Sequence, residues 1–342
     1  MALPLDRILV RHWVRLNAKQ VNDYCATIPI IKKDLRIFYV KIKDCIHVNA
    51  LKSCRYNIYE EYVTTANQKE HSVANFKQLI TEWDPTKMGP IELTYDGVDF
   101  FITDGVHRIS ILYLLNGEKA ILPLHMCSIT YSPSIIKEID SALKLTTKTS
   151  HYNGWSNGRR EHGYHSFSIY NIKFVGQRDP ANRIAKMQKF YDFTNKSVLD
   201  LGCNTGGLLF HLFGIQKGVG VDFDETCIAA AKVIQNRLGL YPHLSFIQRD
   251  LQKEDTADLF SQKYDVTFLL SMGSWVKNWK ILYESALNCS SVVFLETNND
   301  GEGKPQLDFF RERNCDVKLI SESSDDDVTG NLGRKTYLIT CL

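Results

Sequence analysis

The sequence has almost no net charge and no long apolar run. Its 41 lysine and arginine residues are balanced by 39 acidic residues, which gives a formal charge of +2. A chain this close to neutral lacks the global field that attracts a polyanion or an anionic membrane surface. No window approaches the roughly 18 apolar residues of a membrane-spanning helix, and we find no internal repeat and no low-complexity tract. We therefore expect no membrane span, and charge gives no sign of a nucleic-acid partner.

Paired cysteine motifs are also missing. The nine cysteines include no C-x-x-C pair and no cysteine and histidine cluster at zinc spacing. The opening residues MALPLDRILVRHWV lack the long apolar core of a signal peptide. These absences predict reduced thiols, no bound metal and a cytoplasmic location.

The second half of the sequence alternates apolar runs with stretches of helical periodicity. Such alternation is typical of an α/β fold with a parallel sheet. Two further strands at the end, CDVKLISES and RKTYLITCL, are separated by a polar loop and predict an antiparallel hairpin. The expected parallel strands are KSVLDLGC, GVGVDF, LSFIQRDL, YDVTFLLSM and SSVVFLETN.

The stretch VLDLGCNTGGLLFHL, residues 198–212, predicts a strand, a glycine turn and a helix. In such sheets ligands bind beyond the carboxyl ends of the strands, where the strand order reverses. Gly202 and Gly206 allow close approach of the backbone to a ligand, and Asn204 tolerates a left-handed conformation. The turn is therefore expected to be a binding loop.

Two aspartates end the next expected strands. A carboxylate at Asp222 can accept hydrogen bonds from both hydroxyls of an adenosine ribose, which argues against a 2′-phosphate ligand. Asp250 ends the third strand and is placed to approach the adenine amino group. The pattern thus predicts an adenosine ligand.

Together, DLGCNTGG, GVGVDF, QRDL and YDVTFLLS resemble class I S-adenosylmethionine-dependent methyltransferases over about residues 165–342. The family motif is an acidic residue followed by G-x-G-x-G, and Asn204 replaces the middle glycine. The G-x-G-x-x-G spacing of dinucleotide dehydrogenases does not fit. The resemblance implies a Rossmann-like seven-stranded sheet and S-adenosylmethionine as cofactor, with S-adenosylhomocysteine as product. The implied cofactor residues are Gln177, Arg178, Asp200, Gly202, Cys203, Asn204, Gly206, Asp222, Phe223, Asp250, Leu251 and Ser271.

The lead-in segment, residues 163–187, has two interpretations. Arg178, beside Gln177, is suited to a bidentate pair with the cofactor carboxylate. Alternatively, Arg178 and Arg183 only flank a helix that begins at Pro180. Tyr164 and His165 either face the acceptor or have a structural role in the core or at the surface.

In the first half, residues 91–125 predict strand, turn, strand, the turn TDGVHR, a helix and another strand. Asp104, Gly105, His107 and Arg108 at a helix start suit a phosphate. The pattern resembles the α+β ParB/sulfiredoxin-like fold over about residues 72–130. Sulfiredoxin has its reactive cysteine where this sequence has Val106, which disfavours that chemistry. Either the turn binds phosphate or a nucleotide with magnesium and even transfers phosphate, or Arg108 pairs internally with Asp104.

A chain of 342 residues with 44% hydrophobic content is long enough for two domains. We expect a ParB-like domain with an extension at 1–145, a polar linker at 146–163 and the methyltransferase domain at 164–342. The linker is either a plain connection or an acceptor-binding segment, in which aromatic rings stack on a sugar or base and arginines meet phosphate. The linker side chains concerned are Tyr152, Trp155, Arg159 and Arg160.

Methyl transfer is an in-line displacement that depends on positioning, and a hydroxyl acceptor benefits from a general base. The candidate bases are Glu296 and His165, and Ser271 and Trp275 are expected to shape the pocket. The fourth strand ends in SMGSW rather than an N-P-P-Y type signature, which disfavours amino-group methylation of bases and glutamine.

Three functions follow as hypotheses. The first is O-methylation of a carbohydrate or phosphosugar, such as a polysaccharide terminus, with the ParB-like domain handling phosphate. The second is a nucleic-acid methyltransferase, which the neutral charge disfavours. The third is a non-catalytic binding protein, which a complete set of cofactor motifs disfavours. The acceptor atom and the oligomeric state stay open.

Overall fold

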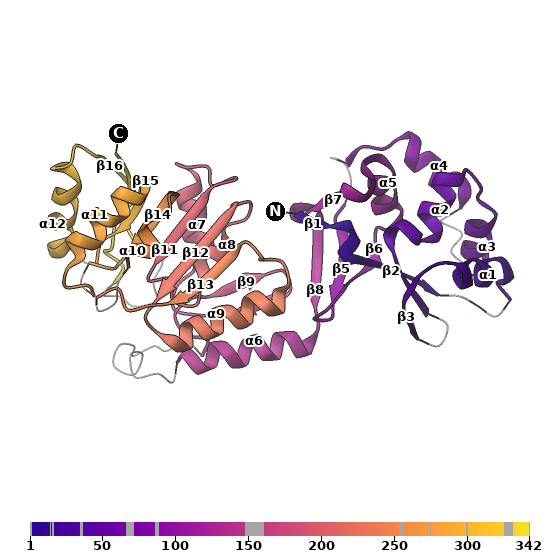
Figure 1. The fold of residues 1–342 in the computed structure, drawn as a ribbon, viewed down its shortest axis with the longest axis horizontal. Coiled ribbons are helices and arrows are strands. Elements are labelled where there is room, and N and C mark those ends of the chain that lie inside the picture. The colour runs from indigo at the N-terminus through magenta and orange to yellow at the C-terminus, as the bar shows by residue number, and fades with distance from the viewer. Residues whose placement is uncertain are drawn as a thin grey trace. The chain divides into compact units, whose positions relative to one another are not determined.

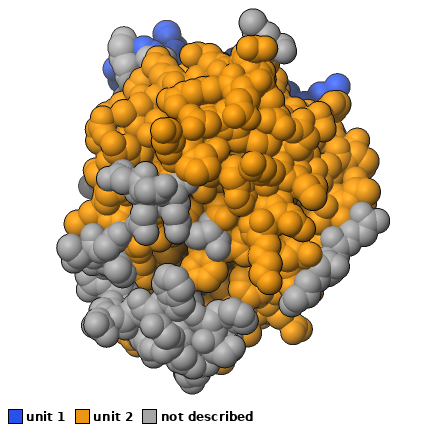
Figure 2. Space-filling view, turned by 90° about the vertical axis from the view of Figure 1, so that its left-hand side faces the viewer, with its two compact units in different colours: residues 1–132 blue, residues 133–342 orange. Residues whose placement is uncertain are grey.

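The structure is a computed structural model that describes residues 2–13, 15, 17–34, 37–65, 72–85, 89–147, 161–252, 256–273, 275–298, 300–324 and 331–341. It divides into two compact units, residues 1–132 and 133–342 (Figure 2). The boundary precedes helix α6 (Pro133–Thr146), whereas the sequence predicts a first domain that extends to residue 145. This helix packs along α9 (Glu225–Leu238) of the second unit, and Glu138 pairs with Arg237 at 2.6 Å. Residues 148–160, the greater part of the expected linker with its candidate acceptor-binding side chains, lie outside the described residues.

The first unit contains a six-stranded mixed sheet with helices (Figure 1). Its strand order is β3-β4-β2-β6-β5-β8, and a separate short pair joins β1 to β7. The strands are β1 (Ala2–Pro4), β2 (Ile8–Trp13), β3 (Ile30–Asp34), β4 (Ile37–Lys41), β5 (Ile91–Tyr95), β6 (Phe100–Asp104), β7 (Ile121–Pro123) and β8 (Cys127–Tyr131). The helices are α1 (Lys19–Thr27), α2 (Ile46–Ser53), α3 (Asn57–Thr65), α4 (Val73–Thr81) and α5 (Val106–Asn116).

The core of this unit forms where apolar side chains of α1 to α4 meet Ile111 of α5. In β5 the alternating side chains of Ile91, Leu93 and Tyr95 are buried, as expected for a strand that covers a core with one face. The elements predicted for residues 91–125 are present in the expected order as β5, β6, α5 and β7.

The second unit is built on a seven-stranded sheet in the order β13-β12-β11-β14-β15-β17-β16 (Figure 1). Its first five strands are parallel, and β17 runs antiparallel to both β15 and β16. The strand order reverses at β11, which pairs with β12 on one side and β14 on the other. The strands are β11 (Ser197–Leu201), β12 (Lys217–Asp222), β13 (Leu244–Gln248), β14 (Tyr264–Leu270), β15 (Ser290–Glu296), β16 (Asp316–Ser321) and β17 (Thr336–Thr340).

Both faces of this sheet are covered. Val198 and Leu199 are neighbours on β11 and point to opposite faces, yet neither is exposed. A short hairpin, β9 (Phe167–Ile169) and β10 (Ile172–Phe174), precedes α7 in the chain. Besides α6 and α9, the helices of this unit are α7 (Pro180–Gln188), α8 (Gly207–His211), α10 (Ala257–Phe260), α11 (Trp279–Cys289) and α12 (Asp300–Arg311).

The antiparallel pair β16 and β17 corrects our expectation that all thiols are reduced. Asp316 lies opposite Thr340 in the register, so the residues just outside this pair, Cys315 and Cys341, face one another. They form a disulfide with a Cα–Cα distance of 4.3 Å. The other seven cysteines are free. Sequence spacing did not reveal the pair because its two members are 26 residues apart.

Candidate active site

The glycine turn after β11 has the conformation that its sequence requires. Gly202, Asn204 and Gly206 all have positive φ, at 79°, 51° and 74°. The N–H groups of Gly202 and Cys203 donate to the carbonyl of Val221 at 2.8 and 3.0 Å, which fixes the turn to the end of β12. The Cys203 side chain is buried. The turn thus presents backbone at the point where the strand order reverses.

Side-chain packing also excludes larger residues from the turn. A Cβ on Gly206 would lie 2.4 Å from the Phe246 ring, and one on Gly202 would lie 2.3 Å from the Met272 sulfur. Gly206 therefore needs glycine for space as well as for backbone conformation, whereas at Gly202 the flexible Met272 side chain would have to move to make room.

Asp222 connects the end of β12 to the turn. One carboxylate oxygen accepts the N–H of Asn204 at 2.8 Å, and the other accepts the N–H of Asp224 at 2.9 Å. Burial raises the pKa of Asp222, and hydrogen bonds from the backbone N–H groups of Asp224, Asn204 and Phe223 oppose that shift. Phe223 follows Asp222 in the chain and is 45% exposed. An acidic side chain is therefore followed directly by a solvent-exposed aromatic residue.

The next strand, β13, leads to Asp250 and Leu251. Asp250 accepts the N–H of Gln252 at 3.0 Å, and Leu251 packs against the core of the second unit. Because β12 and β13 are parallel neighbours, their carboxyl ends share an edge of the sheet. The predicted adenosine-binding residues therefore follow adjacent strand ends, and their contact with a ligand stays a prediction.

Asp200, on β11 just before the turn, is a buried carboxyl group with an unused oxygen. It is 1% exposed, and its Oδ2 has no hydrogen-bond partner among the described residues. Burial raises its pKa to about 7, with Arg183 opposing and Asp222 adding to the shift. An unpartnered buried oxygen costs free energy, and a cationic ligand would relieve that cost.

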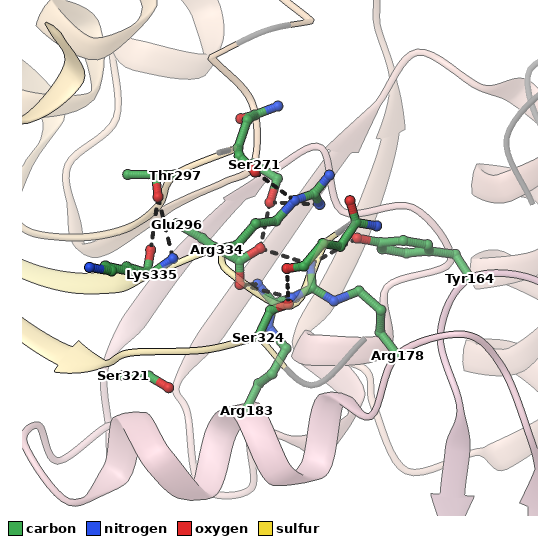
Figure 3. Close-up of polar contacts among 12 residues, drawn as sticks. Tyr164, Arg178, Arg183, Ser271, Glu296, Thr297, Ser321, Ser324, Arg334 and Lys335 are labelled. Atoms are coloured by element: carbon green, nitrogen blue, oxygen red, sulfur yellow. Dashed lines mark hydrogen bonds and ion pairs between the residues drawn. The ribbon is translucent and has the colours of Figure 1, made fainter. Parts of the chain in front are cut away.

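Glu296 at the end of β15 lies at the centre of a buried network (Figure 3). Arg178 donates to both carboxylate oxygens at 2.8 and 2.9 Å, and Arg183 of α7 adds a third bond at 2.9 Å. Ser271 also donates to the carboxylate. Arg334 donates to Ser271 Oγ at 3.3 Å and to the carbonyl of Asn298 at 3.0 Å. We call Glu296, Arg178, Arg183, Ser271 and Arg334 the Glu296 network.

This network argues against Glu296 as a general base. Burial would raise its pKa, but Arg183 and Arg178 more than offset that effect and lower the pKa to about 2. A carboxylate held by two guanidinium groups is a weak proton acceptor. The pair also changes the expectation for Arg178, whose bidentate partner is Glu296 rather than a cofactor carboxylate. Arg178 donates further to the Tyr164 hydroxyl at 2.9 Å.

His165 is similarly unsuited to take up a proton. Its pKa lies well below the usual value, first because the ring is buried and then because Arg183 and Arg178 are near. The ring packs against the start of α8, where a Cβ on Gly207 would come within 2.7 Å of it. The imidazole is therefore neutral, and its surroundings disfavour the imidazolium that a general base becomes. Gln177 lies on the same lead-in segment and donates its backbone N–H to Gly163 at 3.1 Å.

Ser271 is held in an unusual backbone conformation at the end of β14. It has φ of 62°, and its N–H donates to the carbonyl of Glu296 at 2.9 Å. A positive φ at a serine is uncommon and marks a position fixed by its neighbours. Trp275, the second residue expected to shape a pocket, is half exposed.

Arg334 is the member of the network that sequence reasoning missed. It lies just before β17, in a segment interpreted only as a hairpin strand, yet its side chain is buried. The position of Arg334 in the sequence is itself informative, because an arginine next to a buried strand is usually paired with polar or acidic groups when its side chain is buried. The sequence alone does not say that the partners are Ser271 and Asn298.

The TDGVHR turn of the first unit is organised internally. Arg108 donates to the carbonyls of Gly89 and Pro90 and pairs with Asp104 at 2.8 Å. His107 contacts the Tyr59 hydroxyl at 2.7 Å. Gly105 has φ of 94° and begins α5. The internal interpretation of Arg108 is therefore the observed one, and this geometry gives no support for a nucleotide, magnesium or phosphate transfer at this turn.

No helix in the described parts of the chain is long and apolar enough to cross a membrane. Within the same residues, no group of three or more histidine, cysteine, aspartate or glutamate side chains is placed to hold a metal ion.

Part of the second unit is similar to known proteins. The family of methyltransferase domains matches residues 192–291. A carboxy-S-adenosyl-L-methionine synthase of Campylobacter jejuni is 30% identical over 123 residues, which cover 30% of this chain and 52% of that protein. The U6 snRNA methylphosphate capping enzyme Amus of Drosophila melanogaster is 29% identical over 96 residues, covering 25% of this chain and 32% of its own. The chain thus spans about half or less of the length of these curated relatives.

Solved structures with a similar arrangement are distant in sequence. The N-terminal domain of EvdMO1 with S-adenosylhomocysteine (SAH) bound is 14% identical with a TM-score of 0.42, covering 60% of this chain and 95% of that one. The methyltransferase domain of bacterial CtHen1-C is 17% identical with a TM-score of 0.36, covering 47% and 95%.

Proposed function

We propose that the chain is a class I S-adenosylmethionine-dependent methyltransferase, which the methyltransferase-domain match over residues 192–291 supports, and that it transfers the methyl group of S-adenosylmethionine to an oxygen of a carbohydrate or phosphosugar. The observation that carries the cofactor assignment is the connection between the Asn204 amide and the Asp222 carboxylate at 2.8 Å. It fixes a glycine turn and an acidic strand end together where the strand order reverses, which is the place for a ligand in such sheets.

The adenosine part of the cofactor would lie along the ends of β12 and β13. Asp222 keeps acceptor capacity for a ribose hydroxyl, since a carboxylate offers about four lone-pair sites and the backbone N–H groups of Asn204, Asp224 and Phe223 use three. Phe223 offers an exposed ring for the adenine face, and Asp250 stands after the neighbouring strand for its amino group.

The methionine part of the cofactor carries an ammonium and a sulfonium charge. Asp200 lies at the end of β11 beside the turn, and its unpartnered oxygen is available to such a cation. A bound cation would favour the ionised form of this buried carboxyl group. Gly202, Cys203 and Gly206 would meet this part of the ligand through their backbone.

The acceptor is proposed on indirect grounds. Both candidate bases are placed where they accept protons poorly, so an acceptor whose oxygen is already ionised or readily ionised fits the site best. The phosphate oxygens of phosphosugars and the carboxylate oxygens of acidic carbohydrates meet that condition. Catalysis would then rest on positioning in a water-poor site rather than on proton transfer.

A nucleic-acid acceptor is the second candidate. The observation in its favour is the match to a curated relative that is, by its name, a U6 snRNA capping enzyme. The formal charge of +2 argues against it, because several phosphate contacts require a basic face.

Calorimetry with S-adenosylmethionine tests the cofactor assignment. We expect Asp222→Ala to bind at least tenfold more weakly, as expected for loss of charge-assisted hydrogen bonds worth about 1.5–3 kcal/mol. Asp224→Ala is the matched control, because Asp224 caps α9 through the N–H groups of Thr226 and Cys227. Absence of binding to the wild type would refute the proposal. A methyl-transfer screen with labelled cofactor against sugar phosphates, glycans, nucleotides and RNA then separates the acceptors.

A further inference from the structure

The six-stranded sheet of the first unit buries one face and leaves much of the other accessible to solvent. In β4, β5 and β8, buried side chains alternate with exposed or half-buried ones, as expected for strands that cover a core with one face. Helices α1 to α4 pack on the buried side, where Phe38 of β4 joins their core. We call the accessible side the open face; it comprises Arg11, Trp13, Tyr39, Lys41 and Phe101 together with the accessible side chains of β5 and β8.

The strand registers place a continuous row of side chains across five strands of the open face. Neighbouring strands lie about 4.8 Å apart, so a row of five is about 19 Å long. That length exceeds a single sugar or nucleotide and suits several linked units of a polymer. In this row Lys41 lies opposite Leu9, Leu9 opposite Phe101, Phe101 opposite Thr94, and Thr94 opposite Thr130.

Aromatic rings gather on the half of the open face formed by β2, β4 and β6. Tyr39 and Phe101 meet edge to face, with 5.2 Å between their ring centroids. Trp13 is 54% exposed and lies two positions beyond Arg11 on β2, which places it about 7 Å further along the strand. Exposed rings gain free energy when they stack on the flat side of a ring-shaped ligand, because both surfaces then leave water.

Two cations lie next to these rings without a carboxylate partner among the described residues. Arg11 is opposite Tyr39, and Lys41 is its diagonal neighbour, so their Cβ atoms are about 7–8 Å apart. The Lys41 ammonium donates to the backbone carbonyl of Asp6, which does not neutralise its charge. Lys32 differs, because it pairs with Asp96 at 3.9 Å. Two neighbouring positive charges repel each other, and an anion bound beside both would relieve that repulsion.

The half of the open face formed by β5 and β8 carries hydroxyl groups instead of cations. Glu92 lies opposite Ser128, and Thr94 lies opposite Thr130. Hydroxyl and carboxylate oxygens suit the many hydroxyl groups of a sugar, whereas the Glu92 carboxylate would repel the closely spaced phosphates of a nucleic acid. Aromatic rings, two cations and a hydroxyl-rich half together favour a glycan with occasional negative charges over a nucleic acid.

We propose that the open face binds an acidic polysaccharide. Trp13 and Tyr39 stack on its sugar rings, and Arg11 and Lys41 contact its carboxylate or phosphate groups. The hydroxyl side chains of β5 and β8 exchange hydrogen bonds with its sugar hydroxyls. The proposal rests on the proposed function, in which the acceptor is a carbohydrate, and it adds that the acceptor is a negatively charged polymer held by the first unit.

Fluorescence anisotropy with the full-length protein tests the proposal at low salt, with labelled oligogalacturonate and labelled phosphorylated mannan as probes. We expect saturable binding of at least one probe. Binding should weaken about tenfold in Arg11→Gln, as for loss of one charge-assisted contact, and about fivefold in Trp13→Ala, as for loss of one stacked ring. Arg55→Gln and Phe213→Ala are the matched controls, because Arg55 is exposed between α2 and α3 and Phe213 is an exposed ring of the second unit. Circular dichroism verifies that each variant is folded.

Four results would overturn the proposal: no binding of either acidic probe, equally tight binding of unphosphorylated mannan, equal effects of Arg11→Gln and Arg55→Gln, or tighter binding of single-stranded poly(U). The last result would make the partner a nucleic acid. Affinity for S-adenosylmethionine, measured in parallel by calorimetry, should be unchanged in all four variants. Failure of the wild type to bind S-adenosylmethionine would instead refute the proposed function, so the two failures are distinguishable.

Discussion

Arg178 holds Glu296 through two parallel hydrogen bonds across 118 residues of sequence. The pair joins the lead-in segment to the end of β15, and both side chains are buried. Such a pair fixes the position of the lead-in segment relative to β15. Removing one partner leaves the other as an unpaired charge in the protein interior. Its first measurable consequence is therefore on stability.

Glu296→Gln should destabilise the protein by about 3–5 kcal/mol, because two guanidinium groups lose their counter-charge in a buried site. Urea unfolding followed by tryptophan fluorescence measures the change. Glu284→Gln is the control, since Glu284 pairs with Arg313 at 2.7 Å on the surface and should cost at most about 1 kcal/mol. Equal losses in the two variants would contradict the assignment of a buried structural pair.

The same carboxylate predicts how stability responds to acid. The pKa of Glu296 in the fold is lowered to about 2, below its value in the unfolded chain. The contribution of ionised Glu296 to the free energy of unfolding is therefore complete at pH values above the pKa of the unfolded chain. It is lost as the pH falls toward 2. Between pH 5 and 2.5 the wild type should lose more stability than Glu296→Gln, which lacks this titration. Parallel losses in the two proteins would argue against a lowered pKa.

Asp200 predicts a pH dependence of cofactor binding. Its pKa in the unliganded fold is raised to about 7, and a cationic ligand binds better to the ionised form. Affinity for S-adenosylmethionine should therefore rise by up to about tenfold per pH unit below that pKa and level off above it. Proton release on binding at pH 6, measured by calorimetry in buffers of different ionisation enthalpy, checks the sign. Asp200→Asn should bind more weakly with a flat profile; a wild type with the same flat profile would rule out the role.

Gly206→Ala should destabilise the second unit by about 2–4 kcal/mol, because strain at a positive φ of 74° adds to a clash with the Phe246 ring. Gly214→Ala separates the two effects. Gly214 also has positive φ, at 87°, but open space surrounds the position of its Cβ, so only strain of about 1 kcal/mol should appear. Thermal unfolding of both variants measures the difference, and equal shifts would show that packing against Phe246 contributes nothing.

Local patterns predicted the parallel strands of the second unit because the central strands are largely buried on both faces and form apolar runs in the sequence. The turn was also predictable, since Asn204 and its flanking glycines are the residues that adopt positive φ without large strain. Residues 1–70 resisted prediction. Their strand β2 pairs in parallel with β6, more than 80 positions away in the chain, and no local pattern encodes such a pairing.

The roles of charged side chains were the least predictable part of the site. The sequence predicts chemical roles for Glu296, at a strand end, and for Arg178, in the lead-in segment, yet the two side chains pair with one another. Arg108 and Asp104 do the same in the first unit. Whether a charge serves a ligand or a neighbour depends on distances across the fold, and those distances are set by packing rather than by sequence spacing.

The hydrogen bonds of Asp222 have a consequence for redesign of this protein. The carboxylate proposed to select the ribose also supports the amides of Asn204 and Asp224, so recognition and loop architecture share one side chain. Exchanging Asp222 to admit a different nucleoside would loosen the turn at the same time, because the backbone amides of Asn204 and Asp224 would both lose their acceptor. A variant with altered cofactor preference should therefore also lose stability.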